Sequence, residues 1–123
     1  MLTVSNYHYI RPDFTAKYPS IFGVTPAQFE AQLKLLKQQA DFIHPNDLLH
    51  HAKEVLTDKQ RYFFITFDDG LKEQFNHALP ILDALNIPAV FFVNSVNFEH
   101  QKVTTVHKIH LLRSVLDAQT LLD

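Results

Sequence analysis

Residues 62–70 read Tyr-Phe-Phe-Ile-Thr-Phe-Asp-Asp-Gly, and this stretch decides the fold. Its first six residues are aromatic or β-branched without polar alternation, a pattern typical of a parallel strand that is covered on both faces. A second continuous apolar stretch follows at residues 89–93, and residues 71–85 between them have helical spacing. Strand, helix and strand in this order predict a right-handed βαβ unit.

The sequence before this unit predicts a further strand and helix. Residues 2–10 are expected to form a strand that ends at Arg11-Pro12. Thr25-Pro26, with Gln28 at capping-box spacing, indicates the start of an amphipathic helix. A shorter helix is expected over residues 45–56. The first helix is predicted to pack through Phe29, Leu33, Leu36 and Ala40.

The sequence after residue 70 predicts two more helices and a loop. Pro80 is expected to kink or restart the helix at residues 71–85. Residues 94–102 are expected to be a polar loop, and Thr104 or Thr105 to cap a last helix. The inward side chains are predicted to be Phe75, Ala78, Leu79, Leu82 and Leu85 in the earlier helix, and Val106, Ile109, Leu112, Val115 and Leu116 in the last one.

Composition narrows the class of protein. At 123 residues with 46% hydrophobic content, the chain has the length of one small domain with a real core. The net charge is −2, from 11 basic and 13 acidic residues without long runs, which argues against nucleic acid as a partner. There is no cysteine, so disulfides and thiolate sites are excluded. No apolar stretch has the length of a membrane span or leader, and the default expectation is a cytoplasmic protein.

The adjacent carboxylates of Asp68 and Asp69 are the main candidate for chemistry. They come directly after a buried strand, where the carboxyl ends of parallel strands collect functional groups, and Gly70 permits an unusual backbone turn. One carboxylate suits a cation, and the other suits proton transfer from water. The alternative is that one of the two merely caps the following helix, and residue spacing alone leaves both readings open.

The string Thr66-Phe67-Asp68-Asp69-Gly70 resembles the first signature motif of the NodB-homology polysaccharide deacetylases. The later Pro88-Ala89-Val90-Phe91-Phe92 resembles the family's Pro-Ala-Thr-Phe-Phe strand, with Val90 in place of threonine. Tyr7-His8-Tyr9 and the first helix are similar to the N-terminal segment of deacetylases from bacterial surface-polysaccharide gene clusters.

The resemblance implies a metal-dependent hydrolase that removes acetyl groups from an N- or O-acetylated sugar or polysaccharide. Asp68 would be the general base, and Asp69 a ligand of a divalent metal ion, expected to be zinc. A metal-bound water would attack the acyl carbon, and the metal would stabilise the oxyanion.

The family's second motif, His-(Ser/Thr)-x-x-His, supplies two histidine ligands and has no match in this sequence. His107 and His110 are the nearest candidates, because residues three apart share a helical face and two imidazoles with Asp69 would form a two-histidine, one-carboxylate site. The favoured alternative places both histidines on the polar or boundary side of the helix, away from Asp69.

Two further predictions concern the other histidines and the phenylalanines. His8 lies near the carboxyl end of the first strand, where it would line the site and contact substrate, or else pack within the strand. The remaining histidines are expected to be solvated, and the phenylalanines of the two apolar strands to form sheet core. These are His44, His50, His51, His77 and His100, and Phe63, Phe64, Phe67, Phe91 and Phe92.

The family's later motifs are also absent, so residues 1–123 are expected to be the N-terminal portion of a deacetylase domain, incomplete and inactive by itself. The predicted fold class is α/β, a partial (β/α) barrel of the NodB-homology type with parallel strands and flanking helices. Its strands cannot close a barrel, and the exposed sheet edge predicts self-association. The alternative to a deacetylase is a truncated, non-catalytic family member that acts as a binding or assembly module.

Overall fold

The computed structural model describes residues 1–117, 119 and 120. In chain order the elements are β1 (Leu2–Tyr7), α1 (Pro26–Lys37), β2 (Asp41–Phe42), α2 (Pro45–His50), α3 (Ala52–Thr57), β3 (Tyr62–Phe67), the π-helical segment η1 (Gln74–Ala78), α4 (Leu79–Leu85), β4 (Ala89–Phe91), α5 (Ser95–His100) and α6 (Thr105–Arg113).

The sheet is entirely parallel and is centred on β3. β1 pairs along one side of β3 over its whole length, from Leu2 opposite Tyr62 to Tyr7 opposite Phe67. On the other side, β2 pairs with the start of β3 and β4 with its end. The predicted parallel α/β fold is therefore confirmed, although β2 was missed, because two residues carry too little pattern.

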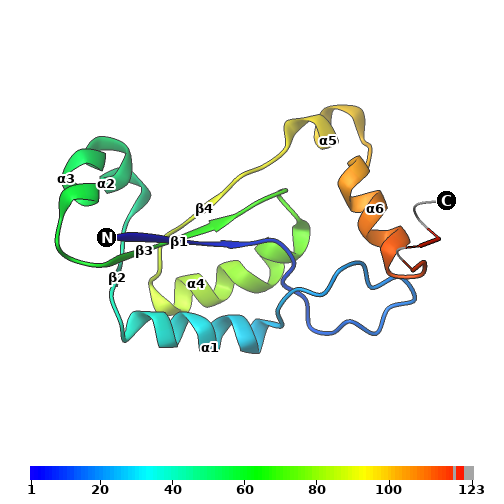
Figure 1. Ribbon diagram of the computed structural model, residues 1–123, viewed down its shortest axis with the longest axis horizontal. Helices are drawn as coiled ribbons and strands as arrows, with labels where there is room; N and C mark the ends of the chain where they lie inside the picture. Colours follow the sequence, from blue (N-terminus) through cyan, green and yellow to red (C-terminus); the bar gives the residue numbers. More distant parts are fainter. Residues whose placement is uncertain (118, 121–123) are drawn as a thin grey trace.

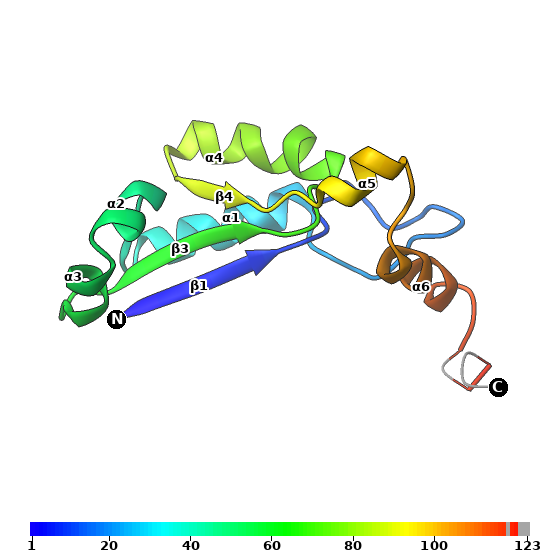
Figure 2. The ribbon, with the colours of Figure 1, turned by 90° about the horizontal axis from the view of Figure 1, so that it is seen from above.

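The main core lies between the sheet and the helices on one of its faces, where Figures 1 and 2 show α1 and α4 side by side. Ile65 and Phe67 of β3 are fully buried against these helices. Helix α1 begins as predicted, with a Thr25–Gln28 capping box and Pro26 in its first turn. The other buried residues of this core are Phe29 and Leu33 of α1, Ala78 and Leu82 of the η1–α4 segment, and Ile10 and Ile87 from the connections.

A smaller cluster covers only the amino-terminal end of the opposite face. Phe64 of β3 packs there with Ile43 and with Val55 of α3, and Leu48 of α2 completes the cluster. Toward the carboxyl ends of the strands this face is open, and the side chain of Val4 on β1 is 54% exposed. The single helix predicted over residues 45–56 is two short helices, α2 and α3, separated at His51.

The helix after β3 differs from the prediction in its inward face. Pro80 lies in the first turn of α4, so the helix does restart there, but the preceding turn is the π-helical segment η1. Phe75 is 42% exposed and Leu79 is also exposed, whereas the polar Gln74 is fully buried. Gln74 shares a face with Ala78 because the two are four residues apart, and a search limited to apolar residues overlooks it.

The C-terminal part contains two corrections. Residues 95–100 form helix α5 rather than a polar loop. The predicted core face of the last helix is wrong, because all five of its residues are exposed, and two of them, Val115 and Leu116, come after the end of α6 at Arg113. Phe92, predicted to be sheet core, is exposed after the end of β4. Figures 1 and 2 show α5 and α6 beyond the carboxyl ends of the strands. Within the described ranges, no helix has the length and apolar character to cross a bilayer.

Candidate active site

The turn after β3 projects two carboxylates from the carboxyl-terminal edge of the sheet. β3 pairs with its neighbours up to this point, since the Asp68 amide donates to the Tyr7 carbonyl at 3.1 Å. Asp69 and Gly70 then both adopt positive φ, at 73° and 60°. Aspartate and glycine are among the residues that tolerate this conformation, and a Cβ at Gly70 would lie 2.9 Å from Val93 Cγ1. The turn therefore suits aspartate at position 69 and favours glycine at position 70.

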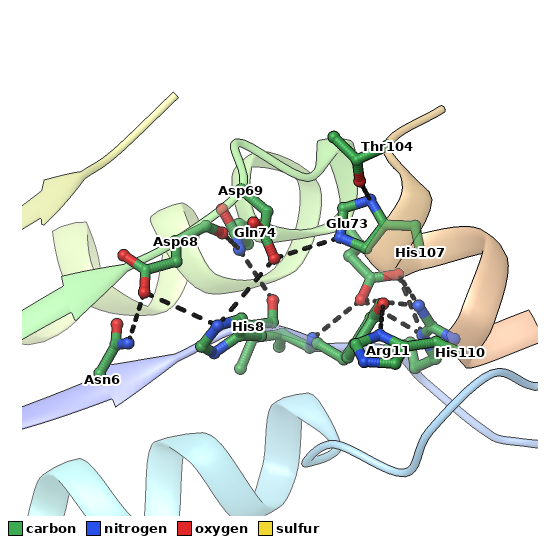
Figure 3. A network of polar contacts seen from close by, with 12 residues as sticks. Asn6, His8, Arg11, Asp68, Asp69, Glu73, Gln74, Thr104, His107 and His110 are labelled. Carbon is green, nitrogen blue, oxygen red and sulfur yellow. Dashed lines mark hydrogen bonds and ion pairs between the residues drawn. The ribbon is translucent and has the colours of Figure 1, made fainter. Parts of the chain in front are cut away.

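The Asp68 carboxylate is held by Asn6 of β1. Asn6 Nδ2 donates a hydrogen bond of 2.7 Å to Asp68 Oδ2, and His8 Nε2 lies 3.7 Å from the same oxygen (Figure 3). The side chains of Asp68 and His8 remain 40% and 43% exposed. His8 is thus at the rim of the site rather than packed within the strand.

The Asp69 carboxylate contacts His107 of α6, which lies 38 residues later in the sequence. His107 Nε2 is 3.1 Å from Asp69 Oδ2, and its Nδ1 is 3.0 Å from Thr104 Oγ1 (Figure 3). A carboxylate only accepts hydrogen bonds, so a neutral His107 donates through Nε2 and accepts the Thr104 hydroxyl proton at Nδ1. His8 Nε2 lies 4.0 Å from Asp69 Oδ2.

Within the described residues, neither Asp68 nor Asp69 caps the helix that follows. No first-turn amide after Gly70 donates to either side chain, and both carboxylates face Asn6, His8 and His107 instead. The expectation that His107 would lie away from Asp69 is wrong, because its side chain is only 12% exposed and contacts that carboxylate.

His110 does not contact Asp69, so the structure does not bring the two histidines and this carboxylate together. Its Nδ1 lies 2.9 Å from the Tyr9 hydroxyl. Desolvation by burial lowers the pKa of His110, and the neighbouring His107 and Arg113 lower it further. Of the histidines predicted to be solvated, His44 differs in role, since its Nδ1 accepts from the Asn46 amide and caps α2.

Asp69 and His107 could supply only some of the ligands that a metal ion needs. Asp69 Oδ2 and His107 Nε2 are 3.1 Å apart, close to the roughly 3.3 Å that separates two ligands in a tetrahedral zinc site. Catalytic zinc sites have three protein ligands, however, and the described part of the chain contains no group of three or more histidines and carboxylates placed to hold one ion. These residues therefore do not make a complete metal site.

Two buried polar contacts next to the site were missed by the sequence analysis. The Arg11 guanidinium binds the Glu73 carboxylate, with Nη2 2.9 Å from Oε2, and Glu73 also accepts the Ile10 amide. Gln74 donates from Nε2 to the backbone carbonyls of His8 and Asp68, at 2.8 and 2.7 Å. Isolated Arg, Glu and Gln residues carry no motif, so only tertiary structure reveals these contacts.

A cavity of about 480 Å³ lies beside Asp69, a size that suits a sugar-sized ligand. It extends between the Asp-Asp-Gly turn and helix α6. Its lining includes the rings of Tyr9 and Tyr18, the cations of Arg11, Lys72 and Lys102, and His107.

Comparison with known proteins places this site in a family. The sequence profile described as "Polysaccharide deacetylase" matches residues 56–117, half of the chain, and includes both aspartates and His107. The chain is 36% identical over 73 residues to the poly-β-1,6-N-acetyl-D-glucosamine N-deacetylase of Staphylococcus aureus, a match that covers 58% of this chain and 25% of that protein. The chain thus spans about a quarter of the length of the curated relatives it matches.

Solved structures show the same fold. IcaB from Ammonifex degensii aligns with a TM-score of 0.61 and 29% identity, over 75% of this chain and 37% of that one. The Streptococcus pyogenes deacetylase PplD aligns with a TM-score of 0.67, over 92% of this chain and 51% of that one, and at 19% identity this likeness concerns the fold alone. The profile match across the Asp68–Asp69 turn, together with this parallel sheet, shows that the chain belongs to the polysaccharide deacetylase family.

Proposed function

We propose that this chain supplies the two working carboxylates of a deacetylase that hydrolyses acetyl groups on an N- or O-acetylated sugar or polysaccharide. The observation that carries the proposal is the pairing of Asp68 and Asp69 at the carboxyl-terminal edge of β3. His8 Nε2 lies within 4.0 Å of the Oδ2 atoms of both. Family membership supports the reaction class.

The two carboxylates have different roles in this proposal. Asp68, the more exposed of the two, is the general base that takes a proton from the water attacking the acyl carbon. A general acid then protonates the leaving amine or alcohol. Asp69 is a ligand of the family's divalent metal ion, here proposed to be zinc, and His107 is the adjacent donor. When bound, that ion supplies positive charge for the developing oxyanion.

The substrate is proposed to enter the cavity between the Asp-Asp-Gly turn and α6. Arg11, Lys72 and Lys102 line that cavity and can donate hydrogen bonds to sugar hydroxyls, and His8 has an exposed imidazole next to the two carboxylates. The Staphylococcus aureus relative is named for poly-β-1,6-N-acetyl-D-glucosamine, so an oligomer of β-1,6-linked N-acetylglucosamine is the first substrate to test.

Acetate release tests the proposal. The full-length protein is incubated with zinc and with either the N-acetylated oligomer or an O-acetylated sugar, and free acetate is measured. We expect release from one substrate, its loss on chelation, and a fall of at least about 100-fold in Asp68→Asn, because a positioned general base contributes on that order. Asp69→Asn should also lose activity. Asp83→Asn, an exposed carboxylate on α4, is the matched control.

The opposite outcome identifies the alternative function. If the wild-type protein releases no acetate from either substrate, or if Asp68→Asn releases it at the wild-type rate, the proposed role of the carboxylates is wrong. Saccharide binding that survives in that case would indicate a non-catalytic binding or assembly module.

We also propose that the chain self-associates through an edge of its sheet. Within the described residues, β1 has β3 as its one strand partner, and β4 likewise pairs only with β3. Unpaired backbone groups along such an edge favour pairing with another strand.

A further inference from the structure

The Asp68 carboxylate has a contact that the signature motif does not include. Asn6 lies opposite Thr66 in the β1–β3 register. Side chains alternate along a strand, so Asp68, two residues after Thr66, extends over the same face of the sheet. The register therefore brings an amide, a hydroxyl and a carboxylate together on the open face.

These three groups form a directed chain of hydrogen bonds. Thr66 Oγ1 donates to Asn6 Oδ1 at 2.9 Å. Asn6 Nδ2 in turn donates to Asp68 Oδ2 at 2.7 Å (Figure 3). Thr66 is 5% exposed, so its hydroxyl is shielded from water. The reversed amide would point Oδ1 at a carboxylate oxygen, and two acceptors repel each other. One orientation of Asn6 is therefore strongly preferred.

We propose that Asn6, oriented by Thr66, is a positioning residue for Asp68 in the deacetylation proposed above, on which this inference rests. The amide holds Oδ2, the oxygen that also faces His8. Asp68 Oδ1 accepts no hydrogen bond from the described residues, so it is the oxygen available to the reacting water. A carboxylate fixed by one oxygen presents the other in a constant direction, which a general base requires.

A merely structural role is the competing explanation. β1 already pairs with β3 at six successive positions, and one further hydrogen bond adds little to folding stability. Loss of such a hydrogen bond would lower the free energy of unfolding slightly and leave kcat unchanged. The two explanations differ in whether kcat changes while the fold is retained.

The experiment compares two substitutions at Thr66. Thr66→Val has nearly the same shape but no hydroxyl, whereas Thr66→Ser keeps the hydroxyl. We expect kcat for acetate release to fall by about 10- to 100-fold in Asn6→Ala and by a smaller factor in Thr66→Val, with KM within about twofold and with recovery in Thr66→Ser. Ser5→Ala, on the opposite face of β1, is the matched control.

A second readout does not depend on turnover. In the nuclear magnetic resonance spectrum, the Asn6 side-chain amide should have one proton shifted by its carboxylate partner. We expect that shift to be lost in Asp68→Ala, reduced in Thr66→Val and retained in Thr66→Ser and Ser5→Ala.

The outcomes separate this inference from the function on which it rests. An Asn6 signal that is insensitive to Asp68→Ala, or equal kcat losses in Thr66→Val and Thr66→Ser, overturns the positioning role. If the wild-type protein releases no acetate, the proposed function fails, and the amide signal alone then decides whether Asn6 holds Asp68.

Discussion

His110 lies three residues after His107 on α6, and its imidazole contacts the Tyr9 hydroxyl instead of a carboxylate. Desolvation is the main reason why its pKa is lowered, and the neighbouring His107 and Arg113 act in the same direction. The folded chain therefore favours neutral His110. In the unfolded chain the same group has its ordinary pKa near 6.5, and it takes up a proton first as pH falls.

The sign of the pH dependence follows from this difference. Because the unfolded state takes up its proton near pH 6.5 and the folded state only at lower pH, the contribution of neutral His110 to stability is present above about pH 6.5 and is lost as the pH falls from there through the lowered pKa of the folded chain. We expect the free energy of unfolding, measured by urea denaturation, to fall more steeply between pH 7.5 and 5.5 in the wild type than in His110→Gln. His100→Gln, which changes an exposed histidine, should keep the wild-type slope; equal slopes for wild type and His110→Gln would contradict this account.

The sequence predicts the carboxylates of the site better than their partners. The Asp68-Asp69-Gly70 turn is specified locally, because its two positive φ angles suit the residues that occupy it. The contact of His107 with Asp69 depends on where α6 comes to lie, and no local pattern contains that information. Asn6 was missed for a similar reason, since its partner becomes visible only through the β1–β3 register.

At the scale of elements, a side chain of segment η1 forms hydrogen bonds to the ends of two strands that carry site residues. Gln74 is fully buried and donates to the His8 and Asp68 carbonyls, so one side chain ties the end of β1 to the end of β3. Its Oε1 is buried without a hydrogen-bond partner among the described residues. π-Helical turns are rare and occur frequently at functional sites, which agrees with this position.

Gln74→Met tests whether the two hydrogen bonds of this side chain stabilise the fold. Methionine has a similar length but no donor, so two buried carbonyls lose their partner, and we expect the free energy of unfolding to fall by about 2–4 kcal/mol. Removal of the unpaired Oε1 offsets part of that loss. Asn76→Met, on the exposed side of the same segment, is the control and should change stability by less than about 0.5 kcal/mol. Equal effects of the two substitutions would show that the tie does not stabilise the fold.

Helix α6 shows why periodicity predicts a helix more reliably than its buried face. The apolar spacing correctly indicated a helix after Thr104, but its apolar side chains are exposed, and the side with His107 and His110 faces the site. An apolar face is buried only where another surface covers it. The sheet offers such a surface to α1 and α4, whereas α6 lies beyond the strand ends.

On the scale of the whole molecule, the sheet is covered unevenly. Helices α1 and α4 cover one face, and the other is covered only at its amino-terminal end. Val4 lies in the middle of the β1 edge with its side chain largely exposed. This chain covers 37% of the aligned IcaB chain and 51% of the aligned PplD chain.

The edge of β1 therefore predicts concentration-dependent association. In sedimentation velocity, we expect the wild-type chain to show a growing fraction of dimer or larger species with rising concentration. Val4→Lys should weaken that association by at least about tenfold in Kd, because a charged side chain on an edge strand opposes pairing with a second strand. Ala31→Lys adds the same charge to the exposed side of α1 and should leave Kd unchanged. If both lysine variants associate like the wild type, β1 is not the surface of contact, and the exposed apolar face of α6 becomes the next one to test with Ile109→Lys.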